Sequence, residues 1–150
     1  MRYFEDFTPG QTFRSRGTAL VEPEAIKTFA ASFDPQPFHL EEAAADRSFF
    51  GGLVASGWHT AGLTMRLLVE GELEPAGGVI GAGVEALRWP TATRPGDVLG
   101  CVSEVLETRP SAKRPELGLV RLETTTTNQR GEVVQVFTCT LIVPHRTARG

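Results

Sequence analysis

The sequence predicts an α+β fold in which a curved antiparallel sheet wraps around one long central helix. Three observations lead to this prediction. Helical periodicity is confined to the first half of the chain, strand-like runs follow after Gly71, and short turns join those runs. Consecutive strands joined by short turns pair antiparallel, and a long amphipathic helix must bury its apolar stripe against a neighbour.

The chain has 150 residues, about the size of one domain, and no proline or glycine cluster separates two larger blocks. We therefore expect a single domain over residues 1–150. No apolar run approaches the roughly 20 residues of a membrane span, and the N-terminus lacks the apolar core of a signal peptide. The net charge of −3 offers no basic field for nucleic acid. We expect a cytoplasmic protein that binds neither membranes nor nucleic acid.

The first third of the chain predicts a strand within residues 12–21 and then two helices. Pro23 suits the first turn of a helix, where its missing N–H costs nothing. Apolar residues then recur at i, i+3, i+4 and i+7. These residues are Ile26, Phe29, Ala30 and Phe33. Pro35 and Pro37 end this helix, and a second, short helix is expected over residues 41–47.

A longer helix is expected over residues 57–70, because apolar side chains recur there with helical spacing. They are Trp58, Ala61, Met65, Leu68 and Val69. We expect this stripe to face the sheet. Gly62 lies on the same stripe, where it allows close approach either of a ligand or of the packed sheet, and we expect the sheet.

Four strand-like runs form the second half of the chain. They cover residues 79–89, 98–107, 117–127 and 132–143. In the last run apolar side chains alternate along one face, which Gln135 alone interrupts. Gly81 and Gly83 within the first run predict a bend or bulge in the sheet.

An acid and an imidazole, Asp34 and His39, lie five residues apart on a predicted loop. Pro35 and Pro37 stand between them, and proline fixes φ near about −65°, so the two side chains are held in a set relation. A neutral imidazole accepts and returns protons near pH 7, and a neighbouring carboxylate can share a water molecule with it. The spacing also fits a structural turn, but the pair is a candidate for chemistry that moves protons to and from water.

The entry into the long helix at Gly57 is a second candidate element. Backbone N–H groups at a helix N-terminus lack intrahelical partners and lie at the positive end of the helix dipole. They can stabilise an oxyanion, and glycine lets a carbonyl oxygen approach closely.

Together these segments resemble the MaoC-like dehydratases, which include the (R)-specific enoyl-CoA hydratases. The matching motifs are Phe-Ala-x-x-x-Asp-x-x-Pro-x-His at 29–39, Phe-Gly-Gly-x-x-Ala-x-Gly at 50–57 and Arg-Pro-Gly-Asp at 94–97. The resemblance runs from Tyr3 through the final strand. It implies a hot-dog fold, homodimers whose paired sheets frame an acyl-thioester tunnel, and no cofactor beyond the coenzyme A of the substrate.

By this resemblance Asp34, His39 and Gly57 are the catalytic residues. The acid and the imidazole add water across the 2,3-double bond of an enoyl-CoA, or remove it from a 3-hydroxyacyl-CoA. The Gly57 N–H stabilises the thioester oxygen. Which of the first two residues acts as the base stays open, because coupled groups share their protons. Further substrate contacts are expected from Ser56, Trp58, Phe38 and Arg114.

The chain departs from the family pattern beside these residues. Phe33 stands where glycine usually precedes the acid, Gln36 where asparagine is usual, and residues 56–58 read Ser-Gly-Trp where His-Gly-Met is frequent. The bulk of Phe33, Phe38 and Trp58 either narrows the acyl pocket toward small or branched chains or only packs.

Arg114 belongs to a basic loop, residues 109–115, between two strands. Arginine and lysine bind phosphate well, so this loop is a candidate for the nucleotide end of coenzyme A. The alternative is a solvated hairpin tip. Cys101 and Cys139 form no CxxC pair, and neither they nor the three histidines form a metal-binding motif, so we expect no metal.

Two other functions stay open. A thioesterase of the same fold would direct the activated water at the thioester and release a free thiol. A non-catalytic subunit would bind acyl-CoA and pair with an active partner. The altered neighbours of Asp34 favour this second alternative, whereas retention of both Asp34 and His39 speaks against it.

Overall fold

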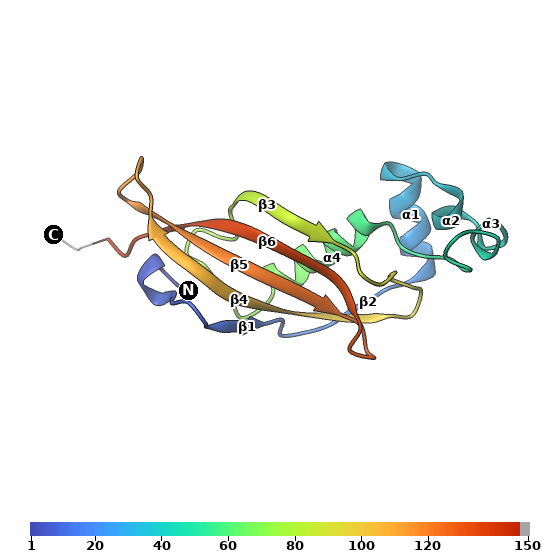
Figure 1. Ribbon diagram of the computed structural model, residues 1–150, viewed down its shortest axis with the longest axis horizontal. Helices are drawn as coiled ribbons and strands as arrows, with labels where there is room; N and C mark the ends of the chain where they lie inside the picture. Colours follow the sequence, from blue (N-terminus) through green and yellow to red (C-terminus); the bar gives the residue numbers. More distant parts are fainter. Residues whose placement is uncertain (148–150) are drawn as a thin grey trace.

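The computed structural model describes residues 1–147 and shows a six-stranded sheet that curves around helix α4 (Gly57–Val69). The strand order is β1-β4-β5-β6-β3, β2 also pairs with β4, and every pairing is antiparallel. The strands are β1 (Thr12–Arg14), β2 (Ala19–Leu20), β3 (Gly81–Arg88), β4 (Val98–Pro110), β5 (Leu117–Thr127) and β6 (Val133–Pro144). The predicted antiparallel sheet around a long helix is confirmed (Figure 1).

The remaining helices are short. They are the 3-10 helix η1 (Phe4–Asp6) and the helices α1 (Pro23–Phe33), α2 (Pro37–Leu40) and α3 (Glu42–Asp46). Helices α1 to α3 gather beyond one end of the sheet, where α4 begins (Figure 1). No helix among residues 1–147 has the length and apolar character needed to cross a membrane.

Helix α1 begins and ends where the prolines predict, but two details differ from expectation. Phe33 is 74% exposed, so it is not part of the buried face that Ile26 and Ala30 form. His39 does not lie on a loop, because Pro37 starts the single helical turn of α2 that carries it. Proline is well suited to that first helical position, where no N–H is needed.

The strand expected within residues 12–21 is present but divided into β1 and β2, because the chain leaves the sheet between them. From Arg14 to Ala19 the chain advances five residues, while its partner β4 advances only three, from Val102 to Leu99. The surplus residues cannot stay in register and loop out. Ser15 anchors the start of this loop by accepting a hydrogen bond from the Cys101 N–H at 3.1 Å.

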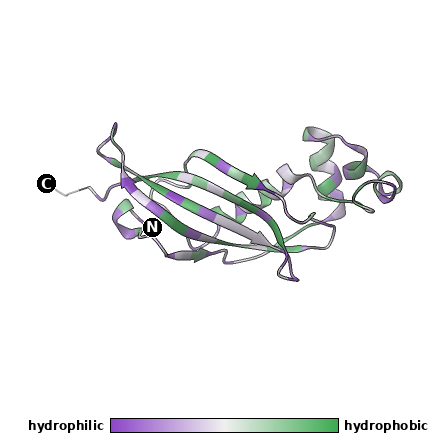
Figure 2. Ribbon diagram, viewed as in Figure 1, coloured by the Kyte–Doolittle hydropathy of each residue, from purple (hydrophilic) through white to green (hydrophobic). Residues whose placement is uncertain are grey.

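The long strands agree closely with the sequence pattern. Strand β5 has the predicted bounds, and its even-numbered residues from Gly118 to Thr126 are buried while the odd-numbered ones are partly exposed. Figure 2 shows hydrophobic and hydrophilic bands alternating along these strands. The pairing of β3 with β6 shifts register between Gly81 and Gly83, which confirms the expected bulge.

The expected burial of the apolar stripe of α4 is wrong. Trp58, Met65 and Val69 are 57%, 46% and 59% exposed, and only Leu68 of the stripe is fully buried. Gly62 is also exposed, and a side chain there would meet no atom within 4 Å, so it does not serve close packing on the sheet.

Threonines form much of the buried face of α4 instead. The Thr60 hydroxyl donates a hydrogen bond to the Thr93 hydroxyl at 2.9 Å, and the hydroxyls of Thr64 and Thr126 lie 2.7 Å apart. Hydroxyl groups can be buried at little cost when they pair in this way. The paired threonines therefore face the sheet and the loop before β4, and the apolar stripe lies on the outside.

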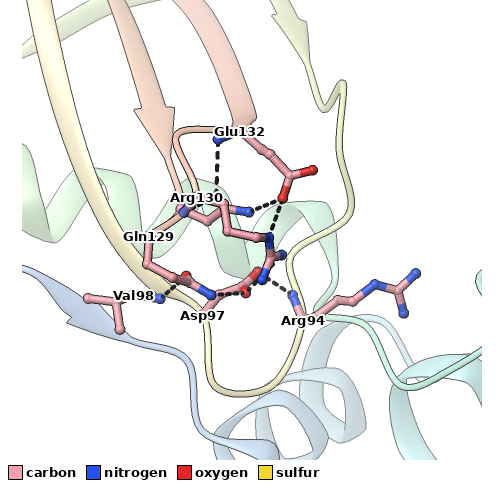
Figure 3. Close-up of polar contacts among 7 residues, drawn as sticks. Arg94, Asp97, Val98, Gln129, Arg130 and Glu132 are labelled. Carbon is pink, nitrogen blue, oxygen red and sulfur yellow. Dashed lines mark hydrogen bonds and ion pairs between the residues drawn. The ribbon is translucent and has the colours of Figure 1, made fainter.

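The turn before β4 is tied to the turn between β5 and β6 by a polar network around Asp97 (Figure 3). The Asp97 carboxylate is 2% exposed and accepts hydrogen bonds from the Arg94 N–H at 2.9 Å and the Gln129 amide at 3.2 Å. The Arg130 guanidinium lies 3.7 Å away, and the Gln129 side-chain oxygen accepts a hydrogen bond from the Val98 N–H. The network fixes the chain just before β4 and just after the loop at residues 91–93, which lines the cavity of the candidate site.

Replacing Asp97 with alanine is expected to lower the free energy of unfolding by about 3 kcal/mol, because the hydrogen bonds that its buried carboxylate accepts are lost. Urea denaturation followed by circular dichroism measures this loss. Glu132→Ala is the matched control, because Glu132 belongs to the same network but is exposed, and a solvent-exposed ion pair such as the one it forms with Arg130 contributes little to stability. Equal losses in the two variants would contradict the assigned role of Asp97.

Candidate active site

Asp34 and His39 meet at the junction of α1 and α2. Asp34 is the C-cap of α1, and Pro37 places His39 within the turn that follows. Oδ2 of Asp34 and Nε2 of His39 lie 3.2 Å apart, and the two side chains are 19% and 6% exposed. The short proline-containing segment therefore brings the acid and the imidazole into direct contact.

The hydrogen bond between His39 and Val54 determines which ring nitrogen of the imidazole carries a proton. Nδ1 lies 2.6 Å from the carbonyl oxygen of Val54, and since a carbonyl can only accept, Nδ1 carries a proton. In the neutral ring Nε2 is then unprotonated and faces a carboxylate oxygen. Two acceptors at this distance need a proton between them or a water molecule beside them that donates to both, so the pair is arranged to hold and transfer one proton.

The Asp34 carboxyl stays ionised despite its partial burial. Burial raises its pKa, but hydrogen bonding by Gln36 and Ser56 and the nearby His39 ring together lower the pKa below its ordinary value. The Gln36 amide donates to Oδ1 at 2.6 Å, which leaves Oδ2 for His39. Gln36 therefore occupies one carboxylate oxygen and directs the other toward the imidazole.

Gly57 is the first residue of α4, and Ser56 is its N-cap. The Ser56 hydroxyl accepts a hydrogen bond from the Trp58 N–H at 3.3 Å. The Gly57 N–H, at the first helical position, has no intrahelical acceptor and lies at the positive end of a helix of 13 residues. It is suited to stabilise negative charge on an oxygen.

A cavity of about 440 Å³ joins these elements. Its lining includes five of the seven site residues that the motifs and their neighbours predict. They are Asp34, Phe38, His39, Gly57 and Trp58. Ser56 is fully buried. Its hydroxyl helps to lower the pKa of Asp34 and caps the start of α4. The cavity thus combines a proton-transferring pair with a helix N-terminus, which suits chemistry on a carbonyl-containing substrate.

Residues 5–128 match the family described as MaoC like domain. The chain belongs to this family. A MaoC-like dehydratase from Rhodospirillum rubrum is 52% identical, with a TM-score of 0.94 over 99% of this chain and 100% of that one. The R-hydratase PhaJ1 from Pseudomonas aeruginosa is 26% identical, with a TM-score of 0.75 over 96% of this chain and 86% of that one. The uncharacterized protein YdeM of Bacillus subtilis is 32% identical over 89% of this chain and 91% of that protein.

These likenesses confirm the hot-dog fold that the motifs imply. Membership of the MaoC-like family, together with the similarity to an R-hydratase, supports a hydratase or dehydratase activity for this chain. In this MaoC-like chain the cavity around Asp34 and His39 contains residues of the matched motifs at 29–39 and 50–57.

Arg114 does not lie near this cavity. It belongs to the turn between β4 and β5, at the end of the sheet opposite α1 to α3 (Figure 1). Its guanidinium pairs with Glu116 at 2.7 Å. Within one chain of this MaoC-like protein Arg114 therefore does not line the cavity, and its expected contact with the nucleotide end of coenzyme A stays a prediction. Phe33, for which both narrowing of the pocket and simple packing were left open, does not line the pocket.

Sequence reasoning missed several residues of the lining, above all Trp89. The indole ring of Trp89 lies against Gly57, where a Cβ would come within 2.5 Å of the ring. Its N–H donates a hydrogen bond to the Gln135 side-chain oxygen at 2.9 Å. One signal in the sequence could have indicated this contact. Gln135 is the one polar residue on an otherwise apolar strand face, and a buried amide needs a polar partner.

Among residues 1–147 neither the cysteines nor the potential metal ligands form a further catalytic or metal site. Cys101 and Cys139 are free thiols, and burial raises the pKa of each to about 11, so neither is a ready nucleophile. Among residues 1–147 no three histidine, cysteine or acidic side chains gather as a metal site would require.

Proposed function

We propose that this chain is an enoyl-CoA hydratase, or in the reverse direction a 3-hydroxyacyl-CoA dehydratase, and that Asp34, His39 and Gly57 carry the reaction. One observation supports the proposal most. Asp34 Oδ2 and His39 Nε2, 3.2 Å apart, open into the same cavity as the N-terminus of α4.

In the proposed reaction a water molecule binds beside Asp34 Oδ2 and His39 Nε2, within hydrogen-bond reach of both, and loses one proton to this pair. Its oxygen forms a bond to the β-carbon of the enoyl thioester, and the electron pair of the double bond moves toward the thioester carbonyl. The Gly57 N–H donates a hydrogen bond to the oxygen on which this charge develops. The pair then returns one proton to the α-carbon, so that water is added and nothing else is consumed.

An absorbance assay tests the proposal directly. The purified chain is expected to remove the conjugated double-bond absorbance of crotonyl-CoA without releasing free thiol. Thiol release in place of hydration would make the chain a thioesterase. Binding of acyl-CoA without turnover of any enoyl-CoA would make it a non-catalytic subunit. Either outcome would overturn the proposed activity.

We further propose that the chain works as a homodimer. β3 is the outermost strand of the sheet and is exposed along nearly its whole length. Beside it lies the apolar stripe of α4, and Met65 and Val84 are 46% and 59% exposed. An unpaired strand edge next to an exposed apolar patch is typical of an interface. A twofold axis through β3 pairs the two edges and covers both stripes.

The double variant Met65→Lys, Val84→Lys is expected to convert the dimer to a monomer, because it places two charges per chain at the proposed interface. Sedimentation equilibrium measures the change in mass. Leu20→Lys is the control, because Leu20 is 58% exposed but lies on β2, away from this face. A monomeric unmodified chain at micromolar concentration would contradict the proposed dimer.

A further inference from the structure

The cavity that holds Asp34 and His39 adjoins a second, apolar groove. This groove has a volume of about 390 Å³ and lies between the outer side of α4 and strands β3 and β6. Its lining is almost entirely apolar and includes Ala61, Met65, Leu87 and Phe137. Trp58 lines both the cavity and the groove, so its side chain stands at their boundary.

Trp89 and Gln135 complete this boundary. Trp89 lines the cavity, Gln135 lines the groove, and the hydrogen bond between the indole N–H and the side-chain oxygen spans the division. The rings of Trp58 and Trp89 meet edge to face with centroids 5.3 Å apart. The two indoles therefore form a continuous aromatic wall between the site and the groove.

The wall is held rigidly. Gln135 is only 1% exposed, and a buried amide would be costly without a partner, so its bond to Trp89 fixes the plane of the indole. On the other side the ring lies against Gly57, where even a methyl group would overlap it. Trp89 thus cannot swing away from the groove without losing its hydrogen bond or leaving its contact with Gly57.

We propose that Trp58 and Trp89, with Gln135 as their anchor, form the end wall of the acyl channel and restrict the chain to short acyl thioesters. The inference rests on the proposed hydratase function. An acyl chain whose thioester carbonyl sits at Gly57 lies next to this wall, because the Trp89 ring contacts Gly57. The groove behind the wall includes Met65 and Val84 of the proposed dimer interface, so in the dimer it becomes an apolar space between the two subunits that a longer acyl chain would occupy if the wall were absent.

The test compares kcat/KM for enoyl-CoAs of 4, 6, 8 and 12 carbon atoms in the unmodified chain and in Trp89→Leu. We expect the unmodified chain to prefer the two shortest substrates and to lose at least about tenfold in kcat/KM at eight carbons. Trp89→Leu is expected to raise the ratio of the eight-carbon to the four-carbon value at least about tenfold. Trp89→Phe and Gln135→Leu, which remove the hydrogen bond but keep bulk, are expected to shift the ratio less.

Phe33→Leu is the matched control, because Phe33 is an exposed aromatic residue that lines neither space. It should leave the chain-length profile unchanged. Two results would contradict the proposed role of the wall while leaving the hydratase proposal intact. One is equal turnover of all chain lengths by the unmodified chain. The other is an unchanged chain-length profile in folded Trp89→Leu and Trp58→Leu.

Binding of saturated acyl-CoAs separates failure of the wall from failure of the proposed activity. By calorimetry the unmodified chain should bind butyryl-CoA and octanoyl-CoA with similar affinity. Trp89→Leu should gain up to about fourfold in affinity for each added methylene that reaches the groove. A gain in affinity would support the proposed role of the wall even if no enoyl-CoA were hydrated. If Trp89→Leu gained no affinity for octanoyl-CoA, that role would be contradicted.

Discussion

Replacing Asp34 with asparagine or His39 with glutamine is expected to lower kcat for enoyl-CoA hydration by a factor of about 10³, within the range for loss of a general acid or base. Each change leaves a side chain of similar size but removes one of the two groups that hold the transferred proton. Because the two residues act as one unit, the double variant should be little slower than either single variant. Initial rates with crotonyl-CoA measure the effect.

The control for this prediction is Glu24→Gln, which makes the same acid-to-amide change on α1, where the side chain is 88% exposed. Its rate should match that of the unmodified chain. Thermal unfolding of all variants shows whether the fold is preserved. Substantial hydration by a well-folded Asp34→Asn variant would exclude the proposed role of the carboxylate.

Gly57→Ala is expected to lower the free energy of unfolding by about 2 kcal/mol and to reduce hydration at the same time. The added methyl would lie 2.5 Å from the Trp89 ring, and overpacking of this kind typically costs about 1–3 kcal/mol. Since Gln135 anchors the ring, relief requires movement of the start of α4, which displaces the N–H proposed to bind the thioester oxygen. Urea denaturation and kcat together measure the effect.

Gly62→Ala is a matched control within the same helix. A Cβ at Gly62 meets no atom within 4 Å, and alanine favours a helix interior by about 0.5–1 kcal/mol over glycine. This variant should be equally or more stable than the unmodified chain. If the two glycine variants behaved alike, the close contact between Gly57 and Trp89 would not explain the result.

Features determined by neighbouring residues were predictable from the sequence. Pro23 and the pair Pro35 and Pro37 place both ends of α1, and alternation alone defines β5. The contact of Asp34 with His39 follows from the same local constraint, because only four residues lie between them. Local patterns and motifs therefore suffice to predict the fold class and the main polar groups of the site.

Features that depend on distant partners were not predictable. The outward orientation of Trp58 and Met65 follows from hydroxyl partners, Thr93 and Thr126, that lie 33 and 62 residues from the helix threonines they bind. The position of Arg114 depends on the length of two strands, and the role of Gln135 depends on Trp89, 46 residues earlier. Local periodicity contains no information about such pairings.

The threonine hydrogen bonds of α4 also fix the orientation of this helix relative to the sheet. A helix held only by interchangeable methyl groups can rotate or slide slightly at small energetic cost, whereas a hydrogen bond of 2.7–2.9 Å tolerates little displacement. Thr60 and Thr64 are one turn apart and bind two different segments, so together they resist rotation about the helix axis and translation along it. The direction of the Gly57 N–H is thus fixed by the hydrogen bonds of Thr60 and Thr64, which lie further along the same helix.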